Sequence, residues 1–345
     1  MDDARKGVEP RAEEWPFISV LVMSHNQQDF IGACLESVLA MPYPGRLEVI
    51  CCDDCSDDAS FEVIERVAAA YRGPYRVVTH RCPTNGRVAV NMNTAVHLAC
   101  GDWFMRVDGD DVMHPDRARL TGLAIMKHPG AVAVSGCLVP FEKEPPEVQN
   151  VPDEALEYRV ADRYDFAGEK PDWLEWWGGV MTMHRSVFGV FGDMPAVCDV
   201  LDDTMFGARV LMLGKFVILR NAILLYYRRH VGNVSSFRTR CRTVRDYLRA
   251  DAASRDYYRR GIPCHEPILQ ELETYTRTHP DCEGVLSYFR ARFIELKRQA
   301  LFWQKPWRER IADAHISGPW WRRIPWALRV SCPWAYALAA RFLRK

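Results

Sequence analysis

The chain has 345 residues and a formal net charge of zero, with 45 basic and 45 acidic side chains. Balanced charge gives no indication of a nucleic-acid partner, no apolar run approaches the ~20 residues of a membrane span, and the polar start lacks an apolar signal-peptide core. The 12 cysteines show no disulfide-framework spacing, so we interpret them as reduced thiols of a cytoplasmic protein.

Hydrophobic periodicity predicts a regular alternation of strands and helices from Phe17 to Cys137. We expect strands at Phe17–Met23, Leu47–Cys52, Tyr75–Thr79, Trp103–Val107 and Ala131–Cys137, and helices at Gln28–Leu39, Ala59–Tyr71, Ala89–Ala99 and Pro115–Lys127. This spacing predicts an α/β fold, with a parallel sheet that carries helices on both faces. Residues 1–16 are charged and aperiodic, so we expect a flexible arm there.

The alternation stops after Cys137. We interpret the following Pro- and Glu-rich stretch as loops, and we expect a Trp/Gly/Met segment, a helix behind an acidic pair, two strands and then mostly helix. These lie in turn at 138–172, Trp173–His184, Thr204–Leu213, Phe216–Leu219, Ala222–Tyr227 and from Thr239 onward. The sequence therefore predicts a helical C-terminal region at 237–345.

Two short acidic turns follow predicted strands of the sheet. Asp53, Asp54, Asp57 and Asp58 form the first turn, and Asp108, Asp110 and Asp111 form the second. Ligands of parallel sheets bind at the carboxyl ends of the strands, where both turns fall. Crowded carboxylates repel one another unless a cation offsets their charge. Such hard oxygen ligands suit Mg²⁺ or Mn²⁺, which usually share their shell with phosphates, so we expect a metal–diphosphate site.

The basic, aromatic C-terminal tail has two interpretations. Tryptophans stand beside arginines in Pro319–Trp326, and apolar residues recur at helical spacing in Leu328–Lys345. The tail is either an interfacial helix on anionic lipid or a helix docked on the rest of the protein. Nucleic acid could use the same chemistry, but nothing upstream resembles a module that binds it, so no nucleic-acid partner is expected.

An ordered set of motifs resembles glycosyltransferase family 2, whose fold is called GT-A. The chain lacks the dinucleotide-binding G-x-G-x-x-G, the P-loop and the G-x-S-x-G and H-E-x-x-H signatures. It carries instead an apolar strand ending in Ser24-His25-Asn26, then Cys52–Asp57, Asn85-Gly86-Arg87, Ala99–Trp103, Asp108–Asp111, Leu201-Asp202-Asp203 and Tyr227–Ser235. The resemblance covers residues 17–236, and it implies a Rossmann-like, mixed but mostly parallel sheet.

The resemblance also implies roles for residues of the two halves of this domain. Residues 17–115 would bind the nucleotide-sugar donor, and residues 116–236 the acceptor. Met23, His25 and Asp54 would contact the base, Arg87 the diphosphate, Asp108 and Asp110 the donor, Asp110 and Asp111 the metal, and Asp203 would be the catalytic base. His230 is either a further metal or diphosphate ligand or an ordinary turn residue. Asp202, Trp176 and Trp177 would face the acceptor, although tryptophans are equally common in cores.

The implied reaction moves a sugar from a nucleotide-sugar, most simply a UDP-sugar, to a hydroxyl of a glycan or lipid-linked acceptor. A divalent ion and Arg87 would stabilise the departing diphosphate, and Asp203 would take the proton of the attacking hydroxyl. In-line attack inverts the anomeric carbon. The alternatives are a nucleotidyltransferase and a non-catalytic nucleotide-sugar binding protein. Two residues depart from the family pattern: Cys55 replaces a usual glycine, and Asp202 replaces a usual glutamate.

Overall fold

The computed structural model describes residues 11–166, 170–171, 174, 177–198, 200, 202–230, 233 and 244–304. Its strands are β1 (Ile18–Ser24), β2 (Leu47–Asp53), β3 (Arg76–Arg81), β4 (Trp103–Asp108), β5 (Val112–Met113), β6 (Ala131–Phe141), β7 (Tyr158–Ala161), β8 (Thr182–His184) and β9 (Lys215–Arg228). Its helices are α1 (Ile31–Leu39), α2 (Ser60–Ala70), α3 (Arg87–Leu98), α4 (Arg117–Lys127), α5 (Ser186–Phe191), α6 (Asp202–Leu213), α7 (Val244–Thr278) and α8 (Glu283–Gln304).

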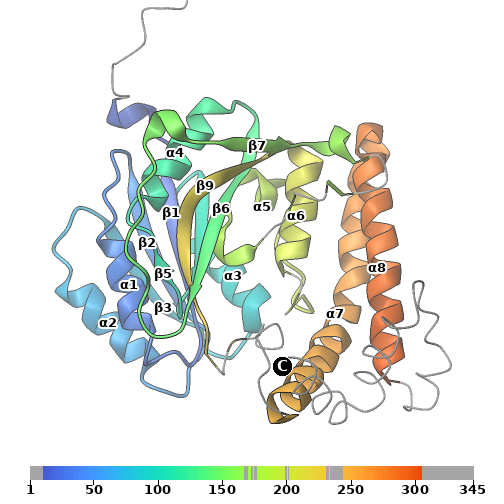
Figure 1. Cartoon of the computed structure of the whole chain (residues 1–345), viewed down its shortest axis with the longest axis horizontal. Coiled ribbons are helices and arrows are strands. Elements are labelled where there is room, and N and C mark those ends of the chain that lie inside the picture. Colours follow the sequence, from blue (N-terminus) through green and yellow to red (C-terminus); the bar gives the residue numbers. More distant parts are fainter. Residues whose placement is uncertain are drawn as a thin grey trace, which may run out of the picture. The chain divides into compact units, whose positions relative to one another are not determined.

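The strands of the described residues form one mixed sheet in the order β3-β2-β1-β4-β8-β6-β9-β5, with β7 paired to β9 (Figure 1). The pairs β1–β2, β2–β3, β1–β4 and β6–β9 are parallel, and β8 joins β4 to β6 in antiparallel fashion. Because β1, β2 and β4 are parallel neighbours, their carboxyl ends meet at one edge of the sheet. The predicted alternation from 17 to 137 and the mixed sheet are thus confirmed.

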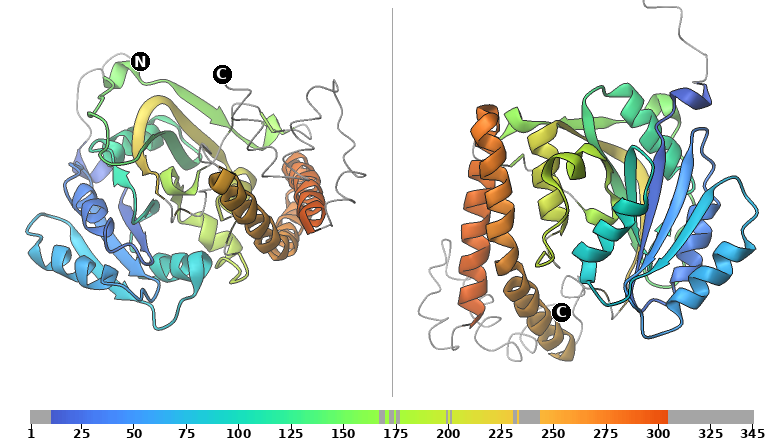
Figure 2. Two further views of the ribbon diagram at one scale, coloured as in Figure 1. Left: turned by 60° about the horizontal axis from the view of Figure 1, so that its bottom comes forward. Right: turned by 180° about the vertical axis from the view of Figure 1, so that it is seen from behind.

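Helices cover both faces of the sheet. Alternate β1 residues Ile18, Val20 and Val22 share a core with α1, α2 and α4, as expected for a strand whose side chains point to opposite faces. Helix α3 packs on the other face of β1 and β2, so the blue strands lie between α1 and α2 on one side and α3 on the other (Figure 2). Both faces of β1 are therefore buried, which explains its continuous apolar sequence.

Three predictions about the chain's course need correction. The stretch 138–172 is not all loop, because β6 continues to Phe141 and β7 forms at Tyr158–Ala161. The two strands expected at 216–227 are the single strand β9, whose pairing with β6 shifts in register and so passes the polar Arg220-Asn221 pair. The arm is ordered near its end, where the Trp15 indole is buried and packs edge-on against Tyr43.

The chain divides into two compact units. The first contains Met1–Arg228 together with Ile268–Tyr288, and the second contains Arg229–Pro267 together with Phe289–Lys345. This division differs from the expected boundary at 236/237, because the last turns of α7 and the start of α8 belong with the sheet. Among the described residues, no helix has the length and apolar character needed to cross a membrane. Residues 1–10, 239–243 and the tail 319–345 lie outside the described residues.

Candidate active site

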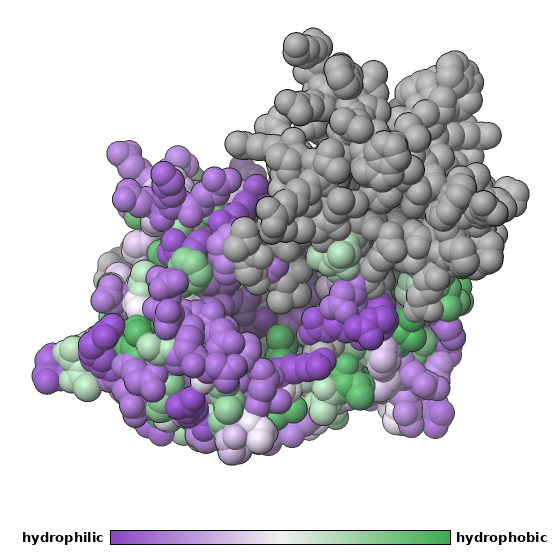
Figure 3. Space-filling view, turned by 90° about the horizontal axis from the view of Figure 1, so that it is seen from below, coloured by the Kyte–Doolittle hydropathy of each residue, from purple (hydrophilic) through white to green (hydrophobic). Residues whose placement is uncertain are grey.

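The candidate site lies where β1, β2 and β4 end, and it belongs entirely to the first unit. The loop Ser24–Gln27 follows β1, the first acidic turn follows β2, and the second follows β4. Figure 3 views this edge, where hydrophilic residues make up most of the described surface. Each strand delivers its polar residues directly after a buried apolar run, so the sheet fixes their positions.

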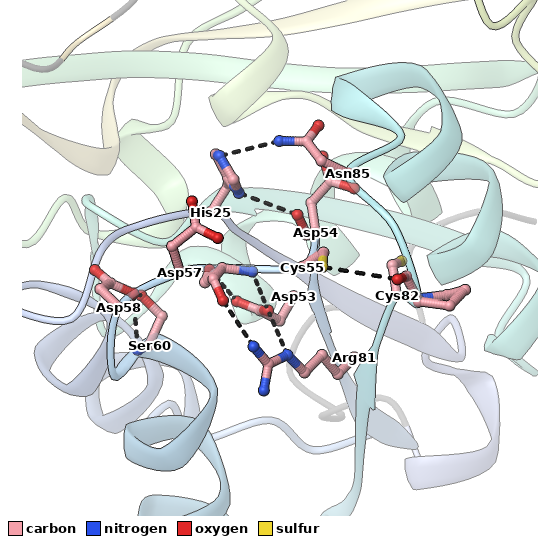
Figure 4. Close-up of polar contacts among 12 residues, drawn as sticks. His25, Asp53, Asp54, Cys55, Asp57, Asp58, Ser60, Arg81, Cys82 and Asn85 are labelled. Atoms are coloured by element: carbon pink, nitrogen blue, oxygen red, sulfur yellow. Dashed lines mark hydrogen bonds and ion pairs between the residues drawn. The ribbon is translucent and has the colours of Figure 1, made fainter.

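Two aspartates of the first turn hold the backbone in place. Asp53 is fully buried and accepts hydrogen bonds from Ser56 N (2.9 Å) and Ser56 Oγ (2.5 Å). Asp58 accepts from Ser60 N (2.9 Å) and Gln28 N (3.1 Å), which fixes the start of α2 and the loop after β1. These are local turn and cap contacts, so Asp53 and Asp58 are structural residues (Figure 4).

His25 is held by a hydrogen-bond chain that fixes its tautomer. Its Nδ1 lies 3.0 Å from the carbonyl oxygen of Asp54, and its Nε2 lies 3.1 Å from Nδ2 of Asn85 (Figure 4). A carbonyl oxygen only accepts, so Nδ1 donates and Nε2 accepts from the Asn85 amide. Asn85 Oδ1 in turn accepts from Arg87 N (3.1 Å). The exposed ring of His25 is therefore a fixed flat surface beside Asp54.

Asp54 is a buried carboxylate that joins two loops. Its Oδ1 accepts from Gly86 N at 2.8 Å, the residue just before α3. Burial raises the pKa of Asp54, an effect that this hydrogen bond partly opposes. Arg87 is exposed at the first turn of α3, whereas the Met23 side chain is buried and its carbonyl accepts from Gly109 N (2.8 Å). Base contact by Met23, His25 and Asp54 and diphosphate contact by Arg87 remain predictions.

Arg106 lies at the centre of the second turn. Its side chain is only 8% exposed, and its Nε and Nη2 donate to Asp108 Oδ1 at 3.1 and 2.8 Å. Its Nη1 donates to Oδ2 of Asp202, the first residue of α6. Burial lowers the pKa of this guanidinium, but the charges of Asp108 and Asp202 outweigh burial and raise it above its usual value.

Asp111 is the most deeply placed carboxylate of the second turn. Its Oδ1 accepts from Arg228 N at 2.9 Å, while Arg228 Nε donates to the Asp110 carbonyl at 2.8 Å. Burial, followed by the charges of Asp110 and Asp108, raises the pKa of Asp111 well above its usual range. The fold therefore assembles negative charge here at a cost that a bound cation would relieve.

A second buried arginine stands behind the turn. Arg117 of α4 is fully buried, and it donates to the carbonyls of Arg106 (2.8 Å) and Gly179 (3.2 Å). Within the described part of the chain, its Nε has no hydrogen-bond partner. Burial lowers the pKa of Arg117 to about 9, and the charge of Asp111 acts in the opposite direction. Arg117 therefore ties the acidic strand to the glycine segment and supplies positive charge beneath the carboxylates.

The Gly178-Gly179 pair packs against the side chains of Arg106, Asp108 and Asp111. A Cβ atom at Gly178 would lie 2.8 Å from Arg106 Nη1, a distance that requires a shift. A Cβ atom at Gly179 would lie 3.3 Å from Asp108 Oδ2 and 3.7 Å from Asp111 Oδ2. The two Oδ2 atoms therefore both lie near the same glycine, whereas the structural hydrogen bonds of Asp108 and Asp111 use their Oδ1 atoms.

These carboxylates suit a divalent ion whose coordination shell is completed by a bound ligand. Among the described residues, no three His, Cys, Asp or Glu side chains are gathered closely enough to hold a metal by themselves. Magnesium-type sites commonly use one or two carboxylates and complete the shell with substrate phosphate and water. Asp108 Oδ2 and Asp111 Oδ2 provide such a pair, whereas Asp110 contributes through its backbone carbonyl to Arg228.

The remaining predicted residues are Asp203, the two tryptophans and His230. Asp203 is in the first turn of α6, where its Oδ1 accepts from Thr204 N at 2.8 Å. Trp177 directly precedes Gly178 and is 37% exposed, while Trp176 lies outside the described residues. His230 belongs to the second unit, where its N–H donates to Asn233 Oδ1 (2.6 Å). The roles of Asp203, the tryptophans and His230 stay predictions.

The sequence analysis assigned no role to three residues that shape this site: Asn85, Arg106 and Arg117. Asn85 orients His25, and the two arginines are buried among the carboxylates. An arginine inside an otherwise apolar strand was a usable signal for Arg106, because an unpaired buried charge is costly and must meet a partner. Arg117 gave no such signal, since an arginine at a helix start is usually exposed.

Comparisons with known proteins indicate the family and the fold. Residues 19–189 match the model of the family described as Glycosyl transferase family 2. The chain is 32% identical over 95 residues to a poly(ribitol-phosphate) beta-glucosyltransferase of Bacillus spizizenii, covering 27% of this chain and 15% of that protein. The matched segments span 15% to 40% of the length of the first three curated relatives.

Two solved structures share the fold at low sequence identity. Staphylococcus aureus TarS 1-349 in complex with UDP superposes with a TM-score of 0.57 and 16% identity, covering 94% of this chain and 88% of that one. The mannosyltransferase PcManGT of Pyrobaculum calidifontis, in complex with GDP-Man and Mn²⁺, gives a TM-score of 0.50 and 18% identity, with coverages of 98% and 90%. These structures confirm the GT-A fold, and the match over residues 19–189 confirms the resemblance to glycosyl transferase family 2.

Proposed function

We propose that this protein is a metal-dependent, inverting glycosyltransferase that uses a nucleotide-sugar donor, most simply a UDP-sugar. The observation that carries the proposal is the pair of Oδ2 atoms of Asp108 and Asp111, which face Gly179 at the carboxyl edge of the sheet. The match to the family supports a sugar-transfer reaction, and solved structures with the same fold hold UDP in one case and GDP-Man with Mn²⁺ in the other.

The donor would extend along the edge from β2 to β4. The base would stack on the fixed ring of His25, and Asp54 would accept a hydrogen bond from a uracil N–H. Arg87 would offset diphosphate charge, and Asp108, Asp110 and Asp111 would hold the ribose and the metal. A bound Mn²⁺ or Mg²⁺ would supply Lewis-acid stabilisation of the leaving diphosphate.

Asp203 would act as general base on the acceptor side. It lies in the first turn of α6, next to Asp202, which is linked through Arg106 to the acidic turn. An acceptor hydroxyl placed between Asp203 and the sugar would lose its proton to the carboxylate as it attacks. Attack opposite the diphosphate is a single displacement, so NMR of the product should show the inverted anomeric configuration.

The proposal predicts different losses for two aspartate variants. Asp111→Asn should abolish Mn²⁺-dependent binding of UDP, because the metal loses a charged ligand. Asp203→Asn should keep UDP binding but lower kcat by about 10² to 10⁴, the usual worth of a general base. Calorimetry with UDP and Mn²⁺ measures the loss of binding. A mass-spectrometric screen of UDP-, GDP- and dTDP-sugars identifies the donor with which the loss of turnover is measured.

Asp116→Asn is the matched control, since Asp116 pairs with Arg119 at the start of α4 and should be dispensable for transfer. Retained transfer in Asp111→Asn or Asp203→Asn would remove that residue's role. Release of pyrophosphate from an NTP would favour a nucleotidyltransferase instead. Binding of UDP with Mn²⁺ but no turnover with any acceptor would favour a non-catalytic binding protein.

We further propose a glycan or lipid-linked acceptor, with the basic aromatic tail contacting the membrane surface. The support is the sequence of the tail, in which tryptophans stand beside arginines between Pro319 and Trp326. Co-sedimentation with anionic liposomes should fall when residues 316–345 are deleted. Pelleting that is unchanged by the deletion would show that the tail is not the anchor.

A further inference from the structure

One guanidinium connects the two ends of the candidate site. Arg106 uses Nε and Nη2 on Asp108 and Nη1 on Asp202, so it joins the end of β4 to the first residue of α6. Asp108 and Asp202 are 94 positions apart in the sequence, and they belong to β4 and α6. The backbone N–H of Arg106 donates to the Met181 carbonyl (3.4 Å) and not to α6, so the side chain makes the link.

The surroundings hold this guanidinium in a single position. Gly178 packs so closely that its missing side chain leaves just enough room for Arg106 Nη1. The carbonyl oxygen of Arg106 is held by Arg117 Nη2 at 2.8 Å. With 8% of its side chain exposed, Arg106 is largely shielded from water, and its contacts to carboxylates are correspondingly strong.

We propose that Arg106 is a positioning residue that sets the separation between the diphosphate end of the site and the proposed base, Asp203. By engaging Oδ1 of Asp108, it leaves Oδ2 directed toward Gly179 beside Asp111. By engaging Asp202, it fixes the first turn of α6. This inference rests on the proposed function, and it gives Asp202 the task of receiving Arg106 instead of contacting the acceptor.

A lysine cannot perform this task. Arg106 presents a planar fork that donates in two directions at once, whereas an ammonium is a compact point charge on a flexible stem. Lysine at this position would still offset the charge of Asp108, so donor and metal binding should persist. It would not hold Asp108 and Asp202 at a fixed distance, and the first turn of α6 would be free to shift.

Arg106→Lys tests the inference, with Arg209→Lys as its matched control. Arg209 is also a buried arginine, located on α6, and it holds Glu271 through Nε (2.9 Å) and Nη2 (2.8 Å) away from the acidic turns. Arg106→Lys should lower kcat by about 100-fold, the effect of a small misplacement of reacting groups. Its donor KM and its Mn²⁺-dependent heat of UDP binding should stay within a few-fold of the wild-type values.

Arg209→Lys should lower the melting temperature but leave kcat unchanged. A wild-type kcat in Arg106→Lys, or an equal loss of kcat in Arg209→Lys, would overturn the positioning role. A wild-type protein without Mn²⁺-dependent UDP binding would overturn the proposed function and the inference with it. If all variants still bind UDP, an unexpected kcat overturns only the positioning role of Arg106. If the wild-type protein does not bind UDP, the proposed function itself fails.

The double variant Arg106→Lys/Asp202→Asn identifies the path of the effect. If Arg106 acts through Asp202, kcat of the double variant should be no lower than kcat of the worse single variant. Losses that multiply would show that Asp202 acts independently, as an acceptor-binding residue would, and would overturn the assignment of Asp202. Thermal melts of each variant with UDP and Mn²⁺ confirm that the compared proteins are folded and loaded.

Discussion

Three non-glycine residues around the candidate site have left-handed backbone conformations, namely Asn26 (φ 53°), Cys55 (φ 56°) and Arg87 (φ 60°). Asn26 and Cys55 lie in the loops that follow β1 and β2, and Arg87 is the first residue of α3. Asparagine tolerates this conformation, but cysteine and arginine do so at a cost. The family's usual glycine at the position of Cys55 now has a physical reason, because glycine adopts positive φ freely.

Cys55→Gly should therefore stabilise the protein. Relief of the left-handed strain is worth about 1 kcal/mol, and the Cys55 thiol makes only a weak contact with the Pro83 carbonyl (3.8 Å). Urea denaturation should show a higher free energy of unfolding with unchanged UDP binding. Cys100→Gly, at an exposed cysteine without positive φ, should not be stabilising. A lower unfolding free energy for Cys55→Gly would contradict this explanation.

Asp54 should make uridine binding sensitive to pH. A protonated Asp54 cannot accept from a uracil N–H through the same oxygen, so affinity should be full above its pKa and fall as the pH decreases through it. Burial raises the pKa of Asp54, so the fall should begin above the usual aspartate value of about 3.9. Titration of uridine at several pH values measures this, and Asp54→Asn should bind weakly without the pH dependence. A wild-type affinity that is flat down to about pH 4 would exclude Asp54 as the acceptor.

The helices and strands of the N-terminal half could be predicted because the apolar residues of each follow one clear pattern. The continuous apolar runs of β1, β2 and β4 and the helical spacing of α1–α4 place the acidic turns at one edge of the sheet. The second half could not be read in the same way. Pro140 in the run that became β6 argued for a loop, and Arg220-Asn221 interrupts β9 in the sequence although the pairing with β6 continues through a register shift.

The parts of the site that were predicted are those set by local sequence, and those that were missed depend on tertiary contacts. The acidic turns followed from strand ends. The Arg106–Asp202 contact joins residues of different elements, and the burial of Arg117 depends on the Gly179 carbonyl reaching it. No local pattern encodes such distant pairings, so an arginine in a strand indicates only that some carboxylate must be near.

Glu48 connects the start of β2 to β1, to β3 and to the turn before β4. Its Oε1 accepts from Ser19 Oγ (2.6 Å) and Cys100 N (2.6 Å), and its Oε2 from Arg76 Nη1 (2.5 Å). Glu48→Gln should lower the free energy of unfolding by about 2 kcal/mol, the worth of hydrogen bonds to a charged group. Glu157→Gln, at an exposed pair with Arg220, should change it little.

The pH dependence of this contribution has a definite sign. Burial alone would raise the pKa of Glu48, but the hydrogen bonds from Ser19 and Cys100 and the ion pair with Arg76 lower it below the usual value. A depressed folded-state pKa gives stability that is present above the unfolded-state pKa and lost as the pH falls through the folded one. The gap between wild type and Glu48→Gln should therefore close on acidification; a gap that widens would contradict the assignment.

At the scale of the whole molecule, the sheet unit depends on residues from the end of the chain. Ile268, Leu272, Val285 and Leu286 are buried, and the segment Ile268–Tyr288 belongs to the first unit. Arg209, which is fully buried, pairs with Glu271. The segment Ile268–Tyr288 of the C-terminal helices is therefore a structural part of the unit that contains the sheet.

Glu271→Gln should destabilise the sheet unit strongly. Removing one partner leaves the Arg209 charge buried and uncompensated, at a cost of about 3 kcal/mol. Chemical denaturation monitored by tryptophan fluorescence should show this loss, whereas Glu266→Gln, at an exposed site on the same helix, should be close to neutral. Equal stability of the two variants would show that α7 does not support the sheet.

The central claim is that carboxylates at the end of β4 bind a divalent ion together with a nucleoside diphosphate. Isothermal titration of UDP into the full-length protein tests it most directly. We expect a saturable heat with Mn²⁺, a much weaker one when EDTA replaces the metal, and none in Asp111→Asn with Mn²⁺. The absence of heat with Mn²⁺, or the same heat with and without metal, would contradict the claim.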